Sequence, residues 1–163
     1  MVYKMNIYAD GTCRGNGKPG STAAAAAVFQ LLHGRQTSYT CLLPKYPNPT
    51  NQRAELTGMI IALEEAIERH RNLRKAPMLS VRIFTDSKYV IGCLNEWLQK
   101  WRLNGWTNAA GRMVANRDLI EKASNLVDEL NKVGTVEYVW IPREENFEAR
   151  EACNEVLDEA NYI

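Results

Sequence analysis

The sequence has few features of zinc-binding or disulfide-rich proteins. Its four cysteines, at positions 13, 41, 93 and 153, are widely separated and form no C-x-x-C pair, which argues against a zinc site. Two disulfides are possible by count, but the N-terminus does not have the pattern of a secretory signal. We therefore expect free thiols and an intracellular location, in the cytoplasm or the nucleus.

Long apolar runs and a large net charge are also missing. No apolar stretch approaches the ~18 residues that a membrane span requires, so we expect no membrane association. The formal net charge is +1, which means that any nucleic-acid binding must depend on a local patch. Hydrophobic residues make up 45% and charged residues 24% of the chain, as in ordinary globular proteins. The length suits a single domain, residues 1–163.

Hydrophobic periodicity predicts a chain of alternating strands and helices. The expected strands are residues 5–10, 22–32, 36–43, 80–85 and 136–141. The expected helices are residues 53–73, 88–97, 115–131 and 147–161. The alanine run 23–27 has helical propensity, but its place between a glycine-rich turn and Val28-Phe29 favours a strand. This order predicts an α/β fold with a five-stranded mixed sheet, its first three strands antiparallel, flanked by helices.

Three acidic residues occupy similar positions in this pattern. Asp10 and Asp86 each end a predicted strand, and Glu55 lies in the first turn of a helix that Thr50 or Asn51 caps. Ligands gather outside strand ends in open sheets, and clustered carboxylates require a cation. Oxygen-only ligation favours Mg²⁺ or Mn²⁺. Each residue taken alone also fits an ordinary turn, cap or helix-dipole role.

Five motifs, in order along the chain, resemble those of type 1 ribonuclease H. They are Asp10-Gly11-Thr12-Cys13-x-Gly15-Asn16-Gly17, Thr50-Asn51-Gln52-Arg53-Ala54-Glu55-Leu56, Thr85-Asp86-Ser87-x-Tyr89-Val90, Trp101-x3-Gly105-Trp106 and Val114-x-Asn116-x-Asp118-Leu119. The resemblance implies the ribonuclease H-like fold and a monomeric endonuclease that cuts the RNA strand of RNA/DNA hybrids. It also implies that Asp10 bridges two Mg²⁺ ions (Mn²⁺ is possible), with Glu55 and Asp86 serving one of them.

The same resemblance implies a set of substrate-binding residues. These are Cys13, Asn16, Asn51, Gln52, Ser87, Lys100 and Trp106. Asn16, Asn51 and Gln52 match positions that contact the minor groove and ribose hydroxyls, and the 2′-hydroxyl distinguishes RNA from DNA. Lys100 lies in a segment that resembles the family's protrusion, where cations meet DNA phosphates. The alternative interpretation makes Asn16 a turn residue, Asn51 a helix cap, and the tryptophans part of the core.

The sequence departs from the family pattern near its C-terminus. The loop Pro142-Arg143-Glu144 resembles a variant without the usual histidine, and the motif that continues from Asn146 has Arg150 where the fourth acid is expected. A second alignment would supply Asp158 instead, but its helical register fits less well. A guanidinium at the fourth position would repel one ion and could pair with Asp10. The sequence therefore favours an active nuclease and leaves two alternatives open, a catalytically inactive protein that binds nucleic acid and a purely protein-binding scaffold.

Overall fold

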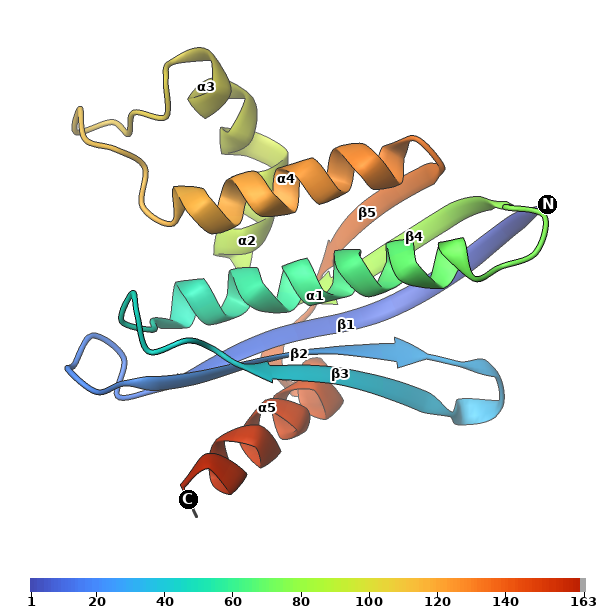
Figure 1. Cartoon of the computed structure of the whole chain (residues 1–163), viewed down its shortest axis with the longest axis horizontal. Helices are drawn as coiled ribbons and strands as arrows, with labels where there is room; N and C mark the ends of the chain where they lie inside the picture. Colours follow the sequence, from blue (N-terminus) through green and yellow to red (C-terminus); the bar gives the residue numbers. More distant parts are fainter. Residues whose placement is uncertain (162–163) are drawn as a thin grey trace.

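A five-stranded mixed sheet forms the centre of the computed structural model, which describes residues 1–161 (Figure 1). Its strands are β1 (Val2–Arg14), β2 (Thr22–Gln30), β3 (Gln36–Leu42), β4 (Met78–Thr85) and β5 (Gly134–Trp140), in the spatial order β3-β2-β1-β4-β5. The first three strands pair antiparallel, whereas β4 is parallel to β1 and β5 is parallel to β4. The predicted fold class is therefore confirmed.

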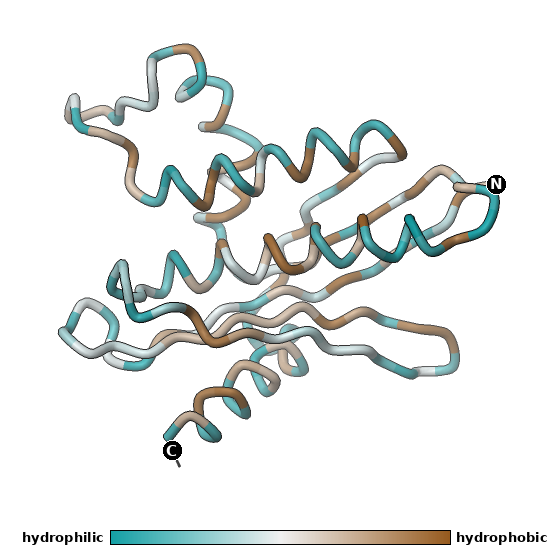
Figure 2. Tube along the Cα trace, viewed as in Figure 1, coloured by the Kyte–Doolittle hydropathy of each residue, from teal (hydrophilic) through white to brown (hydrophobic). Residues whose placement is uncertain are grey.

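Helices cover both faces of this sheet (Figure 1). The helices are α1 (Asn51–Arg71), α2 (Lys88–Gly92), α3 (Leu98–Leu103), α4 (Arg117–Asn131) and α5 (Phe147–Ala160). Helices α1 and α4 pack together on one face, and α5 lies on the other. The tube in Figure 2 is brown mainly along the strands and on the inward sides of the helices, where the core lies. Within residues 1–161, none of the helices combines the length and the apolar character needed to cross a bilayer.

The alanine run 23–27 forms the middle of β2, as predicted from its context and against its helical propensity. Alternate alanines point to opposite faces: Ala24 and Ala26 pack against α5, and Ala23 and Ala25 pack against Ala54 of α1. Small side chains at these positions let the helices on both faces approach the strand closely, because larger ones would hold the helices away. The run therefore brings both helix layers close to the sheet.

Two predicted elements differ from the structure by more than two residues at an end. Strand β1 continues four residues beyond Asp10, because the antiparallel pairing with β2 extends to Arg14 opposite Thr22. Asp10 therefore lies within a strand and not at its end. The helix predicted at 88–97 continues as a π-helical turn, Cys93–Trp97, and then as α3. At the start of α1, the Thr50 hydroxyl accepts a hydrogen bond from the Arg53 amide at 3.1 Å, so Thr50 is the cap.

Candidate active site

The three predicted acids line one cavity. The acid cavity has a volume of about 280 Å³ and opens where β1 and the end of β4 meet the first turn of α1. Its lining residues are Asp10, Gly11, Thr12, Cys13, Asn51, Glu55, Asp86 and Arg143. The structure thus brings together carboxylates that lie far apart along the chain, from Asp10 to Asp86.

Two glycines set the short distance between α1 and β1. A Cβ atom added to Gly11 would lie 2.1 Å from the carbonyl carbon of Ala54, and one added to Gly58 would lie 2.4 Å from the carbonyl oxygen of Asp10. No other residue type fits such backbone contact. The contact places Glu55, one residue after Ala54, beside the carboxylate of Asp10.

Crowding of these acids changes their proton affinity. Burial, followed by the negative charges of Asp86 and Glu55, raises the pKa of Asp10 to about 7, although the Gly11 amide and Arg143 oppose the shift. Burial also raises the pKa of Glu55, and the hydrogen bond from Ser87 opposes that change. Ionised carboxylates this close repel one another. A divalent cation in the cavity would relieve the repulsion.

Neutral polar groups hold two of the carboxylates in place. The Ser87 hydroxyl donates to Glu55 Oε2 at 2.6 Å and accepts from the Val90 amide at the start of α2. The Asn146 side-chain amide donates to Asp86 Oδ1 at 3.0 Å and to the Ala9 carbonyl oxygen at 2.9 Å. Ser87, predicted to bind nucleic acid, is buried here and positions an acid.

The donor set of the cavity fits a magnesium or manganese ion. Its acids present oxygen atoms only, which these hard cations prefer. Asn146, whose amide nitrogen holds Asp86, has its Oδ1 atom buried without a hydrogen-bond partner. Across residues 1–161, no three His, Cys, Asp or Glu side chains are already gathered closely enough to hold an ion.

Arg150 does not enter the acid cavity. Its guanidinium donates to the Arg143 carbonyl oxygen at 2.9 Å and lies 5.7 Å from the centre of the Phe147 ring. The expectation that Arg150 could pair with Asp10 is therefore wrong, because the guanidinium is engaged on the outer side of the loop. Asp158 forms an ion pair of 2.8 Å with Arg14 and does not line the cavity, so the alternative alignment gains no support.

The residues predicted to read RNA connect the glycine loop to α1. Asn16 Oδ1 accepts from the Asn51 amide at 3.0 Å, and Asn51 Oδ1 accepts from the Cys13 amide at 3.2 Å. The exposed Gln52 accepts a hydrogen bond from Asn116 at 3.4 Å. These contacts fix the loop at the rim of the acid cavity and leave Gln52 and Asn16 facing solvent.

The tryptophan segment, residues 97–106, lies apart from the acid cavity. Trp106 is only 8% exposed and stacks on Trp101 at 6.1 Å between ring centres. The ring packs against the core and anchors the segment, and the expectation that Trp106 contacts substrate stays a prediction. Trp97 is 39% exposed, and Lys100 is exposed on α3.

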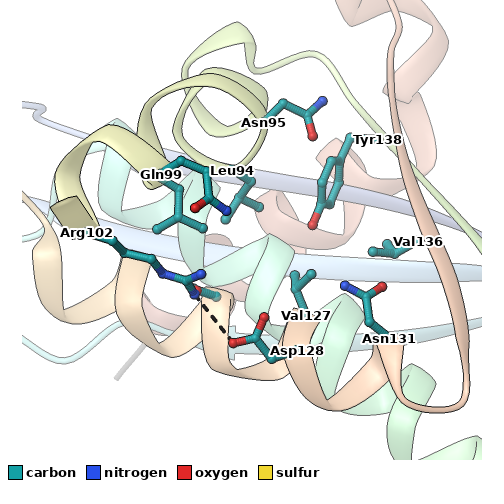
Figure 3. A pocket seen from close by; sticks show the side chains of 11 residues that line it. Leu94, Asn95, Gln99, Arg102, Val127, Asp128, Asn131, Val136 and Tyr138 are labelled. Atoms are coloured by element: carbon teal, nitrogen blue, oxygen red, sulfur yellow. Dashed lines mark hydrogen bonds and ion pairs between the residues drawn. The ribbon is translucent and has the colours of Figure 1, made fainter.

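A second cavity, of about 250 Å³, lies behind this segment between α3, α4 and β5 (Figure 3). The side-chain amides of Asn95, Gln99 and Asn131 surround it, and Tyr138 points its ring toward it. Arg102 forms an ion pair with Asp128 at its edge. None of the predicted site residues lines this cavity.

Sequence reasoning did not include Arg143 and Asn146 among the site residues. Both follow β5, in the 3₁₀ turn Arg143–Asn146. Polar residues directly after the last strand reach the same edge of a parallel pair as residues after β4, and this signal could have identified them.

Comparisons with known proteins agree with this fold. The family model described as RNase H matches residues 3–160. Ribonuclease H of Clostridium botulinum (strain Hall) is 32% identical, over 97% of this chain and 98% of that protein. Ribonuclease H of Pseudomonas syringae pv. syringae is 33% identical, over 100% and 98% respectively. The crystal structure of LC9-RNase H1, a type 1 RNase H with the type 2 active-site motif, superposes with a TM-score of 0.70 at 24% identity, covering 93% of this chain and 71% of that one.

Proposed function

Because the chain belongs to the ribonuclease H family, we propose that it hydrolyses the RNA strand of RNA/DNA hybrids with Mg²⁺ or Mn²⁺. The observation that carries this proposal is the cavity in which Asp10, Glu55 and Asp86 converge from three separate elements. A fold without a functional site at this position would have no need for three carboxylates in one partly buried cavity. Their mutual repulsion is a cost that a metal-dependent reaction explains.

Each acid has a defined part in this proposal. A divalent ion held there supplies activation of water and stabilisation of the leaving oxygen. Asp10, Glu55 and Asp86 would hold the ion. Asp10 must lose its proton first, which its pKa of about 7 allows near neutral pH.

Two neighbouring residues orient the acids in the proposed reaction. The Ser87 hydroxyl keeps one oxygen of Glu55 directed by a hydrogen bond of 2.6 Å. Asn146 does the same for Asp86 at 3.0 Å. Such partners of metal-binding groups fix their geometry, which supports efficient catalysis.

Hybrid recognition in this proposal uses the rim of the acid cavity and the tryptophan segment. Asn51 and Cys13 line the cavity, and Asn16 and Gln52 lie next to them at the start of α1. Their amides suit ribose hydroxyls and base edges in a minor groove. Lys100 projects from α3 and suits the phosphates of the DNA strand.

A second candidate function is binding of hybrids without cleavage. The observation in its favour is that residue 150 is an arginine engaged outside the cavity, so three acids are available and not four. A site with fewer acids holds divalent ions less tightly. This candidate keeps the same substrate and differs only in the chemical step.

A cleavage assay separates the two functions. A hybrid labelled on the RNA strand is incubated with the protein and Mg²⁺ or Mn²⁺, beside Asp10→Asn and Arg150→Asp variants. Cleavage by the parent but not by Asp10→Asn supports the nuclease. Cleavage only by Arg150→Asp supports the binding protein. Absence of both cleavage and binding, with every variant folded by circular dichroism, would refute both functions.

A further inference from the structure

The second cavity, between α3, α4 and β5, has features of a binding site that the proposed function does not use (Figure 3). Its volume of about 250 Å³ is just below the range for pockets of drug-sized ligands, which begins at ~300 Å³. That volume suits a ligand with a single ring system. The three acids line a different cavity, so a ligand bound here would not occupy the acid cavity.

Three side-chain amides, those of Asn95, Gln99 and Asn131, surround this second cavity. All three residues are exposed. Among the side chains labelled in Figure 3, the one dashed line joins Arg102 to Asp128, so none of the amides is bonded to another labelled side chain. Each amide therefore keeps a donor and an acceptor for a ligand.

The lining of the second cavity has no net charge. Its charged residues within 1–161 are Arg102 and Asp128, which pair with each other at 3.4 Å, and Arg102 also donates to the Ser124 hydroxyl. The Tyr138 hydroxyl points into the cavity, and burial raises its pKa, so the group stays protonated and neutral. A neutral ligand with both donors and acceptors matches this lining best.

Apolar side chains from separate elements form the walls. Leu94 and Leu98 come from the segment that leads into α3, Val127 comes from α4, and Val136 comes from β5. Aliphatic walls favour a flat ligand, because its faces contact the walls while its edge meets the amides. A sugar suits such walls less well, since its hydroxyls would be buried without partners.

The wall that carries Leu94 and Asn95 is the π-helical turn Cys93–Trp97. Turns of this kind are rare and are frequently found at functional sites. Here the Trp97 ring lies over Gly92, where an added Cβ atom would be 2.6 Å from a ring carbon. The irregular turn is therefore built into the fold beside the second cavity.

We propose that the second cavity binds one unpaired nucleobase, presented by a free nucleoside or by a single-stranded nucleic acid. Bases are flat and neutral, and they carry donors and acceptors along one edge. Asn and Gln amides pair with such edges, and proteins that bind single-stranded RNA read unstacked bases in this way. The inference goes beyond the proposed function, because it requires neither the acid cavity nor a hybrid.

Nuclear magnetic resonance on the full chain tests nucleoside binding directly. The side-chain amide signals of Asn95, Gln99 and Asn131 are followed while adenosine, cytidine or ribose is added. We expect a nucleoside to shift all three signals with millimolar affinity, as suits a small ligand in an open cavity, and ribose to leave them in place. No shift with either nucleoside, or an equal shift with ribose, would overturn the inference.

Variants locate the bound base. Gln99→Ala removes one amide, Val127→Phe fills the cavity, and Gln36→Ala is the matched loss of an exposed amide on β3, outside the cavity. Gln99→Ala should weaken nucleoside binding roughly fivefold or more, Val127→Phe should abolish it, and Gln36→Ala should leave it unchanged. Circular dichroism checks that Val127→Phe is folded. Gln99→Ala, at an exposed position, decides the question if Val127→Phe does not fold. Equal affinities in Gln99→Ala and Gln36→Ala would contradict the proposed site.

A single-stranded RNA tetranucleotide and an abasic strand of the same length identify the source of the base. If Gln99→Ala binds the tetranucleotide more weakly than Gln36→Ala does, and the abasic strand shows no such difference, the cavity takes a base within a strand. If only the nucleosides show the difference, it takes a free nucleoside. A failure of the parent to cleave or bind a blunt hybrid would refute the proposed function and leave this comparison intact.

Discussion

The acid cavity and the tryptophan segment differ in how firmly the fold holds them. The acids sit on β1, on the end of β4 and on α1, where glycine contacts bring backbones together without intervening side chains. The tryptophan segment projects from the body with α3 and is anchored through Trp106, at a left-handed backbone position with φ 64° (Figure 1). Chemistry requires fixed atoms, whereas phosphate attraction tolerates movement. We therefore assign catalysis to the acid cavity and affinity for the hybrid to the tryptophan segment.

The largest expected effect comes from separating these two roles. Glu55→Gln should lower hybrid cleavage by about a thousandfold while hybrid binding changes little, because the amide cannot supply negative charge to an ion. Lys100→Ala should weaken hybrid binding a few-fold and reduce its salt dependence by about one unit of slope. Single-turnover cleavage and anisotropy at several salt concentrations measure both. Equal loss of cleavage in the two variants would contradict the division of roles.

The second prediction concerns the anchor of the tryptophan segment. Trp106→Ala should lower the free energy of unfolding by about 3–5 kcal/mol, because the ring is packed in the core against Trp101. Trp97→Ala should cost less, on the order of 1 kcal/mol, since that ring remains 39% exposed. Urea denaturation followed by far-ultraviolet circular dichroism measures both. A larger loss for Trp97→Ala would show that the segment is anchored elsewhere.

The third prediction uses the pKa of about 7 at Asp10. Because this folded-state pKa lies above the unfolded value, Asp10 stabilises the metal-free protein below about pH 4, and that stabilisation is lost as the pH rises to 7. The loss is on the order of 4 kcal/mol. Asp10→Asn should remove this slope and be more stable than the parent at pH 8. Excess Mg²⁺ should narrow the difference.

Urea titrations between pH 4 and pH 8, with a chelator or with Mg²⁺, measure this difference. A variant as pH-sensitive as the parent would place the coupled ionisation on another group, with Glu55 the first alternative because its pKa is raised too.

The difference between the acid cavity and the tryptophan segment also explains what could be predicted from the sequence. Strands, the long helix α1 and the convergence of the three acids followed from periodicity, from sheet geometry and from the motifs around Asp10, Glu55 and Asp86. The direction of the Arg150 side chain could not be predicted in this way, because it depends on Phe147 and on the carbonyl oxygen of Arg143. The sequence also left open whether Trp106 belongs to the core or to the substrate-binding surface. Trp106 has a left-handed backbone conformation, with φ 64°, which hydrophobic periodicity does not predict.

The smallest expected effect tests the glycine contact itself. Gly58→Ala should lower the free energy of unfolding by about 2 kcal/mol, because its Cβ would lie 2.4 Å from the Asp10 carbonyl oxygen and push α1 away from β1. Gly34→Ala, at the turn before β3, has open space and carries only the strain of a φ of +72°, about 1 kcal/mol. Only Gly58→Ala should also reduce Mn²⁺ binding, since it alone moves Glu55 relative to Asp10. Unchanged Mn²⁺ binding in a destabilised Gly58→Ala would mean that the acids hold their spacing through Ser87 and Asn146, and not through the backbone contact between α1 and β1.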